Sequence, residues 1–596
     1  MWLTRQYRPF YEECTNTHNM TNKKSIYAIF GAISLLPGIL IYFLFGGNFF
    51  TSMDVFSLIE YGKISSYGDI IRIFSTNMMK NTGFSGNYYR PLSSLTFSID
   101  YSLFGLRAHG YYITNSILLS FCTFCILLYS RTAYTSDILP FLAVFIFLTY
   151  PVLVNVVPSI SRRQDIIFSA LFLLCLIFLF KYIQEGGIYN LTFYLVFIFL
   201  SSLSKETFAS ILIFTFAYTF LSKFYLKDDF RNSICASLYT LALFVAYVMY
   251  RLFVVGSAPA PSGGALDILG ITRQIFNSLY TFAVSTIPLY GKIYSSFSIF
   301  AFSISSILSV AALFKLGNID SKYRYPLIFF LLLAVIALSF SPYISHSLTD
   351  LVITERDGTV SILSKIQLGS SENIINYKDI IRRTFHVILF FLFCIFITII
   401  HTTGIYRDSF KYDKNIVHKF TIYNFTLLIS LGAFLVLLRV SSIRSFFVVS
   451  ILSSILISNE IIFISRRIYR DSYNWKFKVG VLFALPLLCL GAIFNIKSGV
   501  YDVKNEAKSN KIVINSTTRC LSGMRIGTDI PVVTLSNVPD ASLVSDYTLE
   551  SYLRLKKNKN FSVLVNDSKY YENISETKYK CQHEDNDISI AFSSED

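Results

Sequence analysis

The sequence has little charge for its length, and it contains only two tryptophans among 596 residues. Asp, Glu, Lys and Arg make up 15% of the chain, against about 25% in ordinary soluble domains. A soluble chain that is 53% hydrophobic would expose large apolar patches and aggregate. The scarcity of charge therefore excludes an ordinary soluble fold. Apolar stretches of about 20 residues recur along most of the length, which is typical of repeated transmembrane helices.

Clustered cysteines are also missing. The nine cysteines are scattered, and no spacing typical of a zinc site occurs. Cys122 and Cys125 form a CxxC pair, but they lie inside an apolar stretch with no second pair. Cys520 and Cys581 lie in the polar C-terminal region, and they are a candidate disulfide if that region is extracytoplasmic.

The charge that is present is mostly positive, with a formal net charge of +15. Its cations gather in short loops between apolar stretches, where they indicate cytoplasmic loops rather than a nucleic-acid surface. Residues 1–24 are polar and basic, without the pattern of a cleavable signal peptide. They predict a cytoplasmic tail in front of a retained first span.

These features predict an all-α polytopic membrane protein with about thirteen transmembrane helices over residues 25–496. The predicted spans are 25–46, 111–130, 138–157, 166–183, 191–203, 207–222, 233–255, 295–315, 326–343, 385–404, 421–438, 446–464 and 478–496. An extracytoplasmic loop over 47–110 is expected to hold interfacial helices at 67–79 and from Pro91, which suits a first helical turn.

Residues 497–596 predict a small extracytoplasmic α/β domain. Strand-like runs occur at 511–515, 531–535 and 561–565, and residues 540–555 are typical of a helix. The last dozen residues are polar and are expected to fray.

Four short polar segments border the predicted spans, and the span count puts all four on the extracytoplasmic face. They are Met53-Asp54, Tyr88-Tyr89-Arg90-Pro91-Leu92, Ser161-Arg162-Arg163-Gln164-Asp165 and Ser204-Lys205-Glu206. Charge at the edge of a membrane helix is costly and usually functional. One face with carboxylates and several cations predicts a site for a phosphate-bearing substrate.

The second segment opens a tract, YYRPLSSLTFSIDYSLFGLRAHGYYITN over residues 88–115, that resembles the first-loop signature of GT-C membrane glycosyltransferases. The likeness is strongest to the transmembrane O-mannosyltransferases that carry tetratricopeptide repeats. Arg163-Gln164-Asp165 is similar to that family's GRxD, and Leu203-Ser204-Lys205-Glu206 to its LSKE. The ordered set covers the first half of the chain.

The chain departs from that family in three respects. Met53-Asp54 supplies one carboxylate where the family often has two. Tyr112 stands at the position of the family's histidine, and His109 lies three residues earlier. The repeats are absent, and a different C-terminal region replaces them.

The resemblance implies transfer of a sugar, with mannose as the family's sugar, from a polyprenyl- or dolichyl-phosphate carrier. The acceptor would be a protein or glycan outside the cytoplasm. Asp54 is the expected catalytic base for the acceptor hydroxyl, with Glu60 in reserve. The other interpretation of Asp54 is a helix cap.

The leaving group in such a reaction is a lipid phosphate, which needs cations. The predicted phosphate-binding residues are Arg90, Arg162, Arg163, Lys205 and Arg444. For each of them, snorkelling to the lipid headgroups remains the alternative.

Asp165 is expected as a second catalytic acid, or as a metal ligand together with Asp54 if the site takes Mg²⁺ or Mn²⁺. A salt bridge to Arg162 or Arg163 is the alternative for Asp165. The supporting residues predicted for the site are Glu60, Tyr89, His109, Asn115 and Glu206.

The protein is therefore expected to be a multi-pass protein of the cell membrane, or of the endoplasmic reticulum in a eukaryote. Its N-terminus is expected in the cytoplasm and its C-terminal domain outside. The partners are membrane lipids, the lipid-linked sugar donor and the acceptor, without nucleic acid.

Two other functions are weighed against glycosyl transfer from a monosaccharide carrier. An oligosaccharyltransferase would carry a Trp-Trp-Asp signature, but Trp2 and Trp475 are isolated and predicted to be cytoplasmic. A lipid or ion transporter would place its charges near the bilayer midplane and often show internal repeats. Here the charges lie at one edge, and no repeat is visible.

Overall fold

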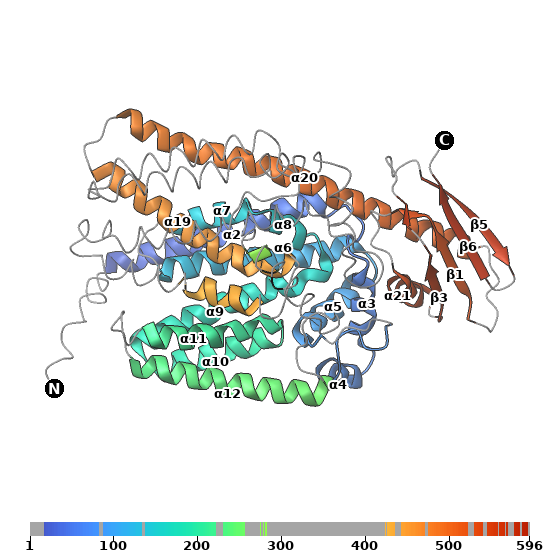
Figure 1. Ribbon diagram of the computed structural model, residues 1–596, viewed down its shortest axis with the longest axis horizontal. Helices are drawn as coiled ribbons and strands as arrows, with labels where there is room; N and C mark the ends of the chain where they lie inside the picture. Colours follow the sequence, from blue (N-terminus) through green and yellow to red (C-terminus); the bar gives the residue numbers. More distant parts are fainter. Residues whose placement is uncertain are drawn as a thin grey trace, which may run out of the picture.

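The computed structural model describes residues 17–82, 88–133, 138–221, 230–256, 424–470, 475–522 and 530–593, the ranges 424–470 and 530–593 with short gaps, together with four residues between 275 and 282. This part of the chain is a mostly helical body with a small sheet at its C-terminal end (Figure 1). The predicted spans 295–315, 326–343 and 385–404 lie outside the described residues, and 421–438 lies partly outside them.

The helical body is built in chain order from helices of very different length. They are α2 (Thr17–Phe45), α3 (Asp54–Gly62), α4 (Tyr67–Ser75), α5 (Pro91–Phe104), α6 (Ala108–Ala133), α7 (Leu139–Leu148), α8 (Pro151–Val156), η1 (Ile160–Arg162), α9 (Arg163–Glu185), α10 (Ile188–Ser202), η2 (Glu206–Ala209), α11 (Ser210–Leu221), α12 (Phe230–Val255), η4 (Ile443–Phe446), α19 (Phe447–Arg470) and α20 (Trp475–Ser522).

Four helices in the described part are long and apolar enough to cross a membrane. They cover Ile26–Phe45, Ala108–Thr132, Ile160–Glu185 and Phe230–Val255, and shorter apolar helices pack beside them. Helices that are apolar on all sides are typical of a membrane span. The protein is thus an integral membrane protein.

One predicted span is interrupted. The stretch 138–157 forms two helices, because α7 ends at Leu148 and α8 begins at Pro151. Proline disfavours helical backbone in the residue before it, and Tyr150 is extended, with φ −73° and ψ 128°. The single helix expected over this range is therefore wrong.

The loop over residues 47–110 contains a helix at each of the two predicted places. Helix α4 begins at Tyr67, where the Ser66 hydroxyl and the Asp69 carboxylate form a capping box. Helix α5 begins at Pro91, which occupies the first helical turn as expected. In Figure 1, α3, α4 and α5 lie at the end of the helical body that faces the sheet.

The C-terminal sheet has the strand order β3-β1-β6-β5. Its strands are β1 (Val532–Ser536), β3 (Ser562–Val565), β5 (Lys578–Glu584) and β6 (Asp587–Ser593), and β2 (Val538–Pro539) and β4 (Ser568–Lys569) form a separate short pair. Strand β1 runs parallel to β3 and β6, whereas β5 is antiparallel to β6. Helix α21 (Asp546–Lys557) makes the crossover between the parallel strands.

The predictions for this region are confirmed in part. The strands near 531–535 and 561–565 are present as β1 and β3, and the helix expected over 540–555 is α21. The end of the chain is not frayed over β6, because Ile588, Ile590 and Phe592 alternate inward and are buried.

The strand expected at 511–515 is wrong, because these residues continue α20. Buried side chains recur along this part of α20 every three or four residues, which is the helical period. They are Val503, Ala507, Asn510, Ile514, Thr517 and Leu521. Since this stripe faces the protein, burial outweighs the local β-propensity of residues 511–515.

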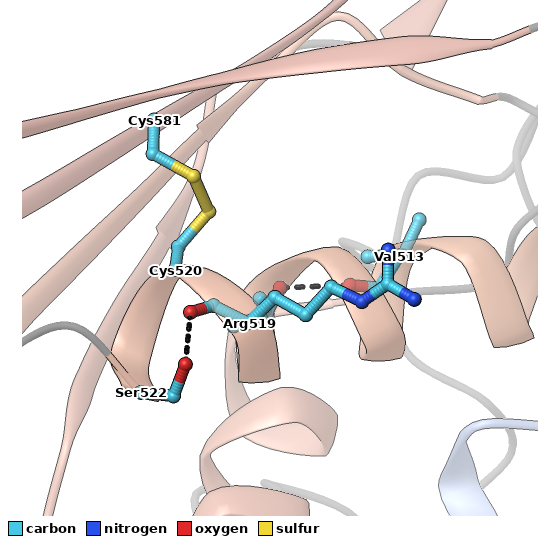
Figure 2. Close-up of a disulfide and its surroundings, with 6 residues drawn as sticks. Val513, Arg519, Cys520, Ser522 and Cys581 are labelled. Carbon is cyan, nitrogen blue, oxygen red and sulfur yellow. Dashed lines mark hydrogen bonds between the residues drawn. A yellow bond between two sulfur atoms is a disulfide. The ribbon is translucent and has the colours of Figure 1, made fainter.

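Helix α20 joins the helical body to the sheet. Its 48 residues span about 70 Å at 1.5 Å per residue, and they pass without a break through residue 497, where a domain boundary was predicted. At the far end, Cys520 forms a disulfide with Cys581 of β5 (Figure 2).

Candidate functional site

The four polar segments of the sequence meet at the end of the helical body that faces the sheet. The Ser161 hydroxyl donates to Ser52 Oγ at 2.8 Å, next to Met53-Asp54. The backbone N–H of Leu92 donates to the Leu203 carbonyl at 3.2 Å. Side-chain ion pairs join the remaining segments to one another. Nine charged residues gather here, and we call them the charge cluster: Asp54, Arg90, Arg162, Asp165, Lys205, Glu206, Arg251, Arg444 and Glu506.

Glu206 is held between two arginines. Arg90 Nη2 lies 3.0 Å from Glu206 Oε2, and Arg251 Nη1 lies 3.1 Å from Oε1. Arg90 also stacks on the Tyr88 ring, with 4.4 Å from Cζ to the ring centroid. Two buried cations against one carboxylate leave this group with a surplus positive charge.

Lys205 forms an ion pair with Asp165, and both side chains are buried. Lys205 Nζ also donates to the Ser445 carbonyl at 3.4 Å, so that the start of η2 is tied to η4. The salt bridge considered for Asp165 is present, but its partner is Lys205 rather than Arg162 or Arg163.

Among the described residues, Arg162 and Arg444 are the cations of the cluster whose side chains have no hydrogen-bond or ion-pair partner. In the part of the chain that the structure describes, neither side chain makes a hydrogen bond or an ion pair, and Arg162 Nε is buried without a partner. Both lie close enough for their charges to repel each other. Two guanidinium groups that lie near each other favour binding of an anion, and the donor fork of a guanidinium suits a phosphate.

Asp54 is the first residue of α3. Its carboxylate interacts electrostatically with Arg444, and its Oδ1 accepts a hydrogen bond of 2.9 Å from the Tyr547 hydroxyl. The predicted base therefore lies within electrostatic range of Arg444.

A second carboxylate, Glu506, comes from the middle of α20. Burial raises the pKa of Glu506 to about 7, Arg444 opposes this rise, and the Asp54 charge adds to it. Glu506 was not among the predicted site residues, because a strand was expected at 511–515 and the last span was expected to end at residue 496. The helical stripe of apolar residues that includes Val503 and Ala507 was the signal that would have placed Glu506 beside it.

Arg163 does not belong to the charge cluster. Its guanidinium is fully buried and lies 2.6 Å from Asp100 Oδ2, and it donates to Asn115 Oδ1 at 2.8 Å and to Thr96 Oγ1 at 3.2 Å. Because these partners surround the guanidinium, no donor faces a ligand. The predicted phosphate contact of Arg163 is corrected to a packing role, and Asn115 supports that packing.

The remaining predicted residues hold the surrounding elements in place. Glu60 forms a two-pronged ion pair with Arg554 of α21, at 2.7 and 3.1 Å, and is thereby removed from the reserve role as base. Tyr89 donates to the Phe74 carbonyl at 2.9 Å. His109 is exposed, and its ring contacts the Tyr42 hydroxyl at 2.8 Å and the Gly46 carbonyl at 3.2 Å. Neither partner belongs to the charge cluster.

The charge cluster does not fit a divalent metal ion. Among the described residues no group of three or more His, Cys, Asp or Glu side chains is arranged to hold one. Asp165 is neutralised by Lys205, and Asp54 has Arg444 beside it, whereas Mg²⁺ and Mn²⁺ require unopposed oxygen ligands. No role for a metal ion is derived from these residues.

Comparisons with known proteins give one distant structural match. No protein-family model and no curated protein matches the chain. The crystal structure of ArnT from Cupriavidus metallidurans bound to undecaprenyl phosphate aligns with a TM-score of 0.36 and 11% identity. The alignment covers 90% of this chain and 85% of that chain. A TM-score this low does not assign a fold, a function or a ligand to this protein.

Proposed function

We propose that this protein is a GT-C-type glycosyltransferase, which moves a sugar from a polyprenyl-phosphate carrier to an acceptor outside the cytoplasm. The observation that carries the proposal is the pair Arg162 and Arg444, which have no side-chain partner among the described residues and lie in the same charge cluster as Asp54. The ordered sequence motifs that resemble this family supply these helix ends. By the same resemblance, mannose is the proposed sugar, and a protein or glycan is the proposed acceptor.

Arg162 and Arg444 are proposed to bind the lipid phosphate. The donor is a phosphodiester with one negative charge, and the departing lipid phosphate is a monoester that gains a second. Cations at this position therefore stabilise the transition state more than the bound donor. Arg90 and Lys205 already have carboxylate partners. They are proposed to lie beside the phosphate and to add to the positive electrostatic potential of the site.

Asp54 is proposed as the general base. As the acceptor oxygen bonds to the anomeric carbon, the bond from that carbon to the phosphate oxygen breaks, and the acceptor proton passes to the Asp54 carboxylate. A direct displacement of this kind inverts the anomeric configuration. Asp165, which is paired with Lys205, is proposed to position that lysine and not to act as a second acid.

The test is sugar transfer by the purified protein in lipid nanodiscs, with a panel of radiolabelled polyprenyl-phosphate sugars. Asp54→Asn is expected to lose at least hundredfold in kcat, within the range for a positioned base. Asp502→Asn is the matched control, because Asp502 is an exposed carboxylate on α20. Full activity of the Asp54→Asn protein would remove Asp54 from the mechanism.

The phosphate site has its own test, which is inhibition by the product lipid phosphate. Arg162→Ala and Arg444→Ala are each expected to weaken this inhibition by tenfold or more, as for loss of a charge-assisted bond. Lys508→Ala, an exposed cation on α20, is the control. If the folded wild-type protein transfers sugar from no donor of the panel, the proposal is wrong, and lipid or ion flux into proteoliposomes becomes the assay.

A further inference from the structure

The C-terminal domain reaches the membrane part of the protein through two helices that run side by side. Figure 1 shows α21 between the sheet and α3. Three side-chain pairs join the two helices: Tyr547 with Asp54, Ser551 with Ser57, and Arg554 with Glu60. The residue numbers rise together in the two helices, so the helices are parallel. Their N-terminal ends therefore meet at Asp54.

The contacts between α21 and α3 form a packed interface. Ser57 and Ser551 are fully buried and lie 3.0 Å apart, and the Phe56 and Tyr552 rings meet edge to face at 4.9 Å between centroids. The two-pronged Arg554–Glu60 pair closes the far end. A forked pair of this kind sets geometry as well as energy, so α21 is held in one register on α3.

The chain in front of Asp54 is fixed from another side. Asn510 of α20 donates to the carbonyls of Phe50 and Thr51, at 3.0 and 2.7 Å. The Thr51 hydroxyl in turn donates to the Pro158 carbonyl at 2.9 Å. These bonds fix the backbone in front of Asp54, but they do not fix the rotation of the Asp54 side chain.

Tyr547 sets that rotation. Its hydroxyl donates to Asp54 Oδ1 at 2.9 Å, and the described residues supply no other hydrogen bond to this carboxylate. Burial, followed by the charge of Asp54, raises the pKa of Tyr547 to about 12. The phenol thus keeps its proton across the physiological range and remains a donor. Oδ1 is occupied, and Oδ2 is left for another partner.

We propose that Tyr547 is a positioning residue of the transferase, which holds Asp54 Oδ1 so that Oδ2 receives the acceptor proton. The proposal rests on the proposed function and extends it: the C-terminal domain is part of the catalytic site. Sugar transfer then requires this domain to be docked on α3. Undocking would leave the Asp54 carboxylate free to rotate toward Arg444.

The test compares two tyrosine-to-phenylalanine variants of the same helix in the full-length protein. Tyr547→Phe is expected to lower kcat by about tenfold to hundredfold, the effect of one hydrogen bond to a charged group. The KM for the lipid-linked donor stays within twofold, because the cations bind the phosphate. Tyr552→Phe removes a hydroxyl whose one hydrogen bond among the described residues is from Lys556, and it is expected to leave both constants unchanged.

Hydrogen exchange separates positioning from folding. In Tyr547→Phe the amides of α3 and α21 are expected to exchange as in the wild type, since the Arg554–Glu60 and Ser551–Ser57 pairs remain. Faster exchange together with lost activity would overturn the positioning role in favour of a structural one. A wild-type kcat in Tyr547→Phe, with Asp54→Asn inactive, would overturn this proposal alone. Absence of transfer by the wild type would overturn it together with the proposed function.

Discussion

At the scale of single residues, the arginines of the polar segments differ only in their surroundings. Arg162 and Arg163 are neighbours in the sequence, yet Arg162 has no side-chain partner among the described residues and Arg163 is enclosed by Asp100, Asn115 and Thr96. Residue type and position relative to the span predicted one role for both. The difference arises from Asp100 of α5, which the sequence analysis did not consider.

This difference predicts that Arg163 contributes to stability and not to donor binding. Arg163→Met is expected to lower the free energy of unfolding by about 3–5 kcal/mol, because the Asp100 carboxylate is left buried without a cation. Adding Asp100→Leu is expected to restore most of the loss, since an apolar pair replaces the ion pair. Thermal unfolding of the purified protein measures both effects. A stable Arg163→Met protein with weakened donor binding would return Arg163 to the phosphate site.

Glu506 predicts a pH dependence of stability. Its pKa in the folded protein is about 7, above the ordinary value of about 4.5 for a glutamate. The unfolded chain therefore loses this proton first as the pH rises. The stability that the protonated form provides is complete below about pH 4.5 and is lost as the pH rises toward 7, by up to about 3 kcal/mol.

Glu506→Gln stays uncharged at every pH and isolates this contribution. The variant is expected to have a higher Tm than the wild type at pH 8, with the difference shrinking toward pH 5. Asp502→Asn, on the exposed side of the same helix, should show no such trend. A difference that is constant between pH 5 and pH 8 would mean that Glu506 ionises as an ordinary glutamate.

At the scale of elements, the first predicted span forms a single helix that packs closely on its neighbour, whereas the stretch 138–157 forms two helices. Helix α2 lies against α6, and Gly38 is the point of closest approach: an added Cβ would overlap Ser120 Oγ and the Ser116 carbonyl oxygen. Small residues at helix contacts let backbones approach in this way in membranes. The stretch 138–157 is equally apolar, yet it breaks before Pro151, where Tyr150 is extended.

A pair of glycines in α2 tests the packing of α2 on α6. Gly38→Ala is expected to destabilise the protein by about 1–3 kcal/mol, since the backbone carbonyl of Ser116 cannot move aside without shifting α6. Gly31→Ala is the matched control, because no atom lies within 4 Å of its added Cβ, and it is expected to stabilise by up to about 1 kcal/mol. Equal shifts of Tm in the two variants would contradict this packing.

At the scale of the whole molecule, α20 and the disulfide attach the C-terminal domain to the helical body. The helix carries Glu506 to the charge cluster and Asn510 to the backbone before Asp54. Its last turn, where the Ser522 hydroxyl bonds to the Arg519 carbonyl, is joined by Cys520 to β5 (Figure 2). The domain is thus connected to the membrane part by a helix, a disulfide and the α21–α3 interface.

The disulfide predicts how this domain responds to reduction. Cys520 and Cys581 are 61 residues apart, and in the chain-entropy account a loop of this length contributes about 4 kcal/mol. Replacing both cysteines with serine is expected to speed hydrogen exchange in the sheet and in α21. The amides of α9 are expected to exchange as slowly as in the wild type. Hydrogen exchange by segment measures this. Unchanged exchange in β5 and β6 would show that the sheet is stable without the bond.

The sequence by itself determined that the protein is an integral membrane protein, and it located the four polar segments whose charged residues meet. Apolar stretches of span length and the polar segments at their ends follow from composition and local pattern. The helix starts at Tyr67 and Pro91 follow from capping and proline geometry. These features depend on a few consecutive residues, which is why they were predictable.

Only the tertiary structure decided which charges are paired. Lys205 with Asp165, Arg163 with Asp100 and Tyr547 with Asp54 join residues that are 40, 63 and 493 positions apart. Side chains of the same type at the same membrane edge are equivalent in sequence, and burial beside a specific partner distinguishes them. For the same reason the hydrogen bond of Tyr547 to Asp54 could be found only after α21 had been placed against α3.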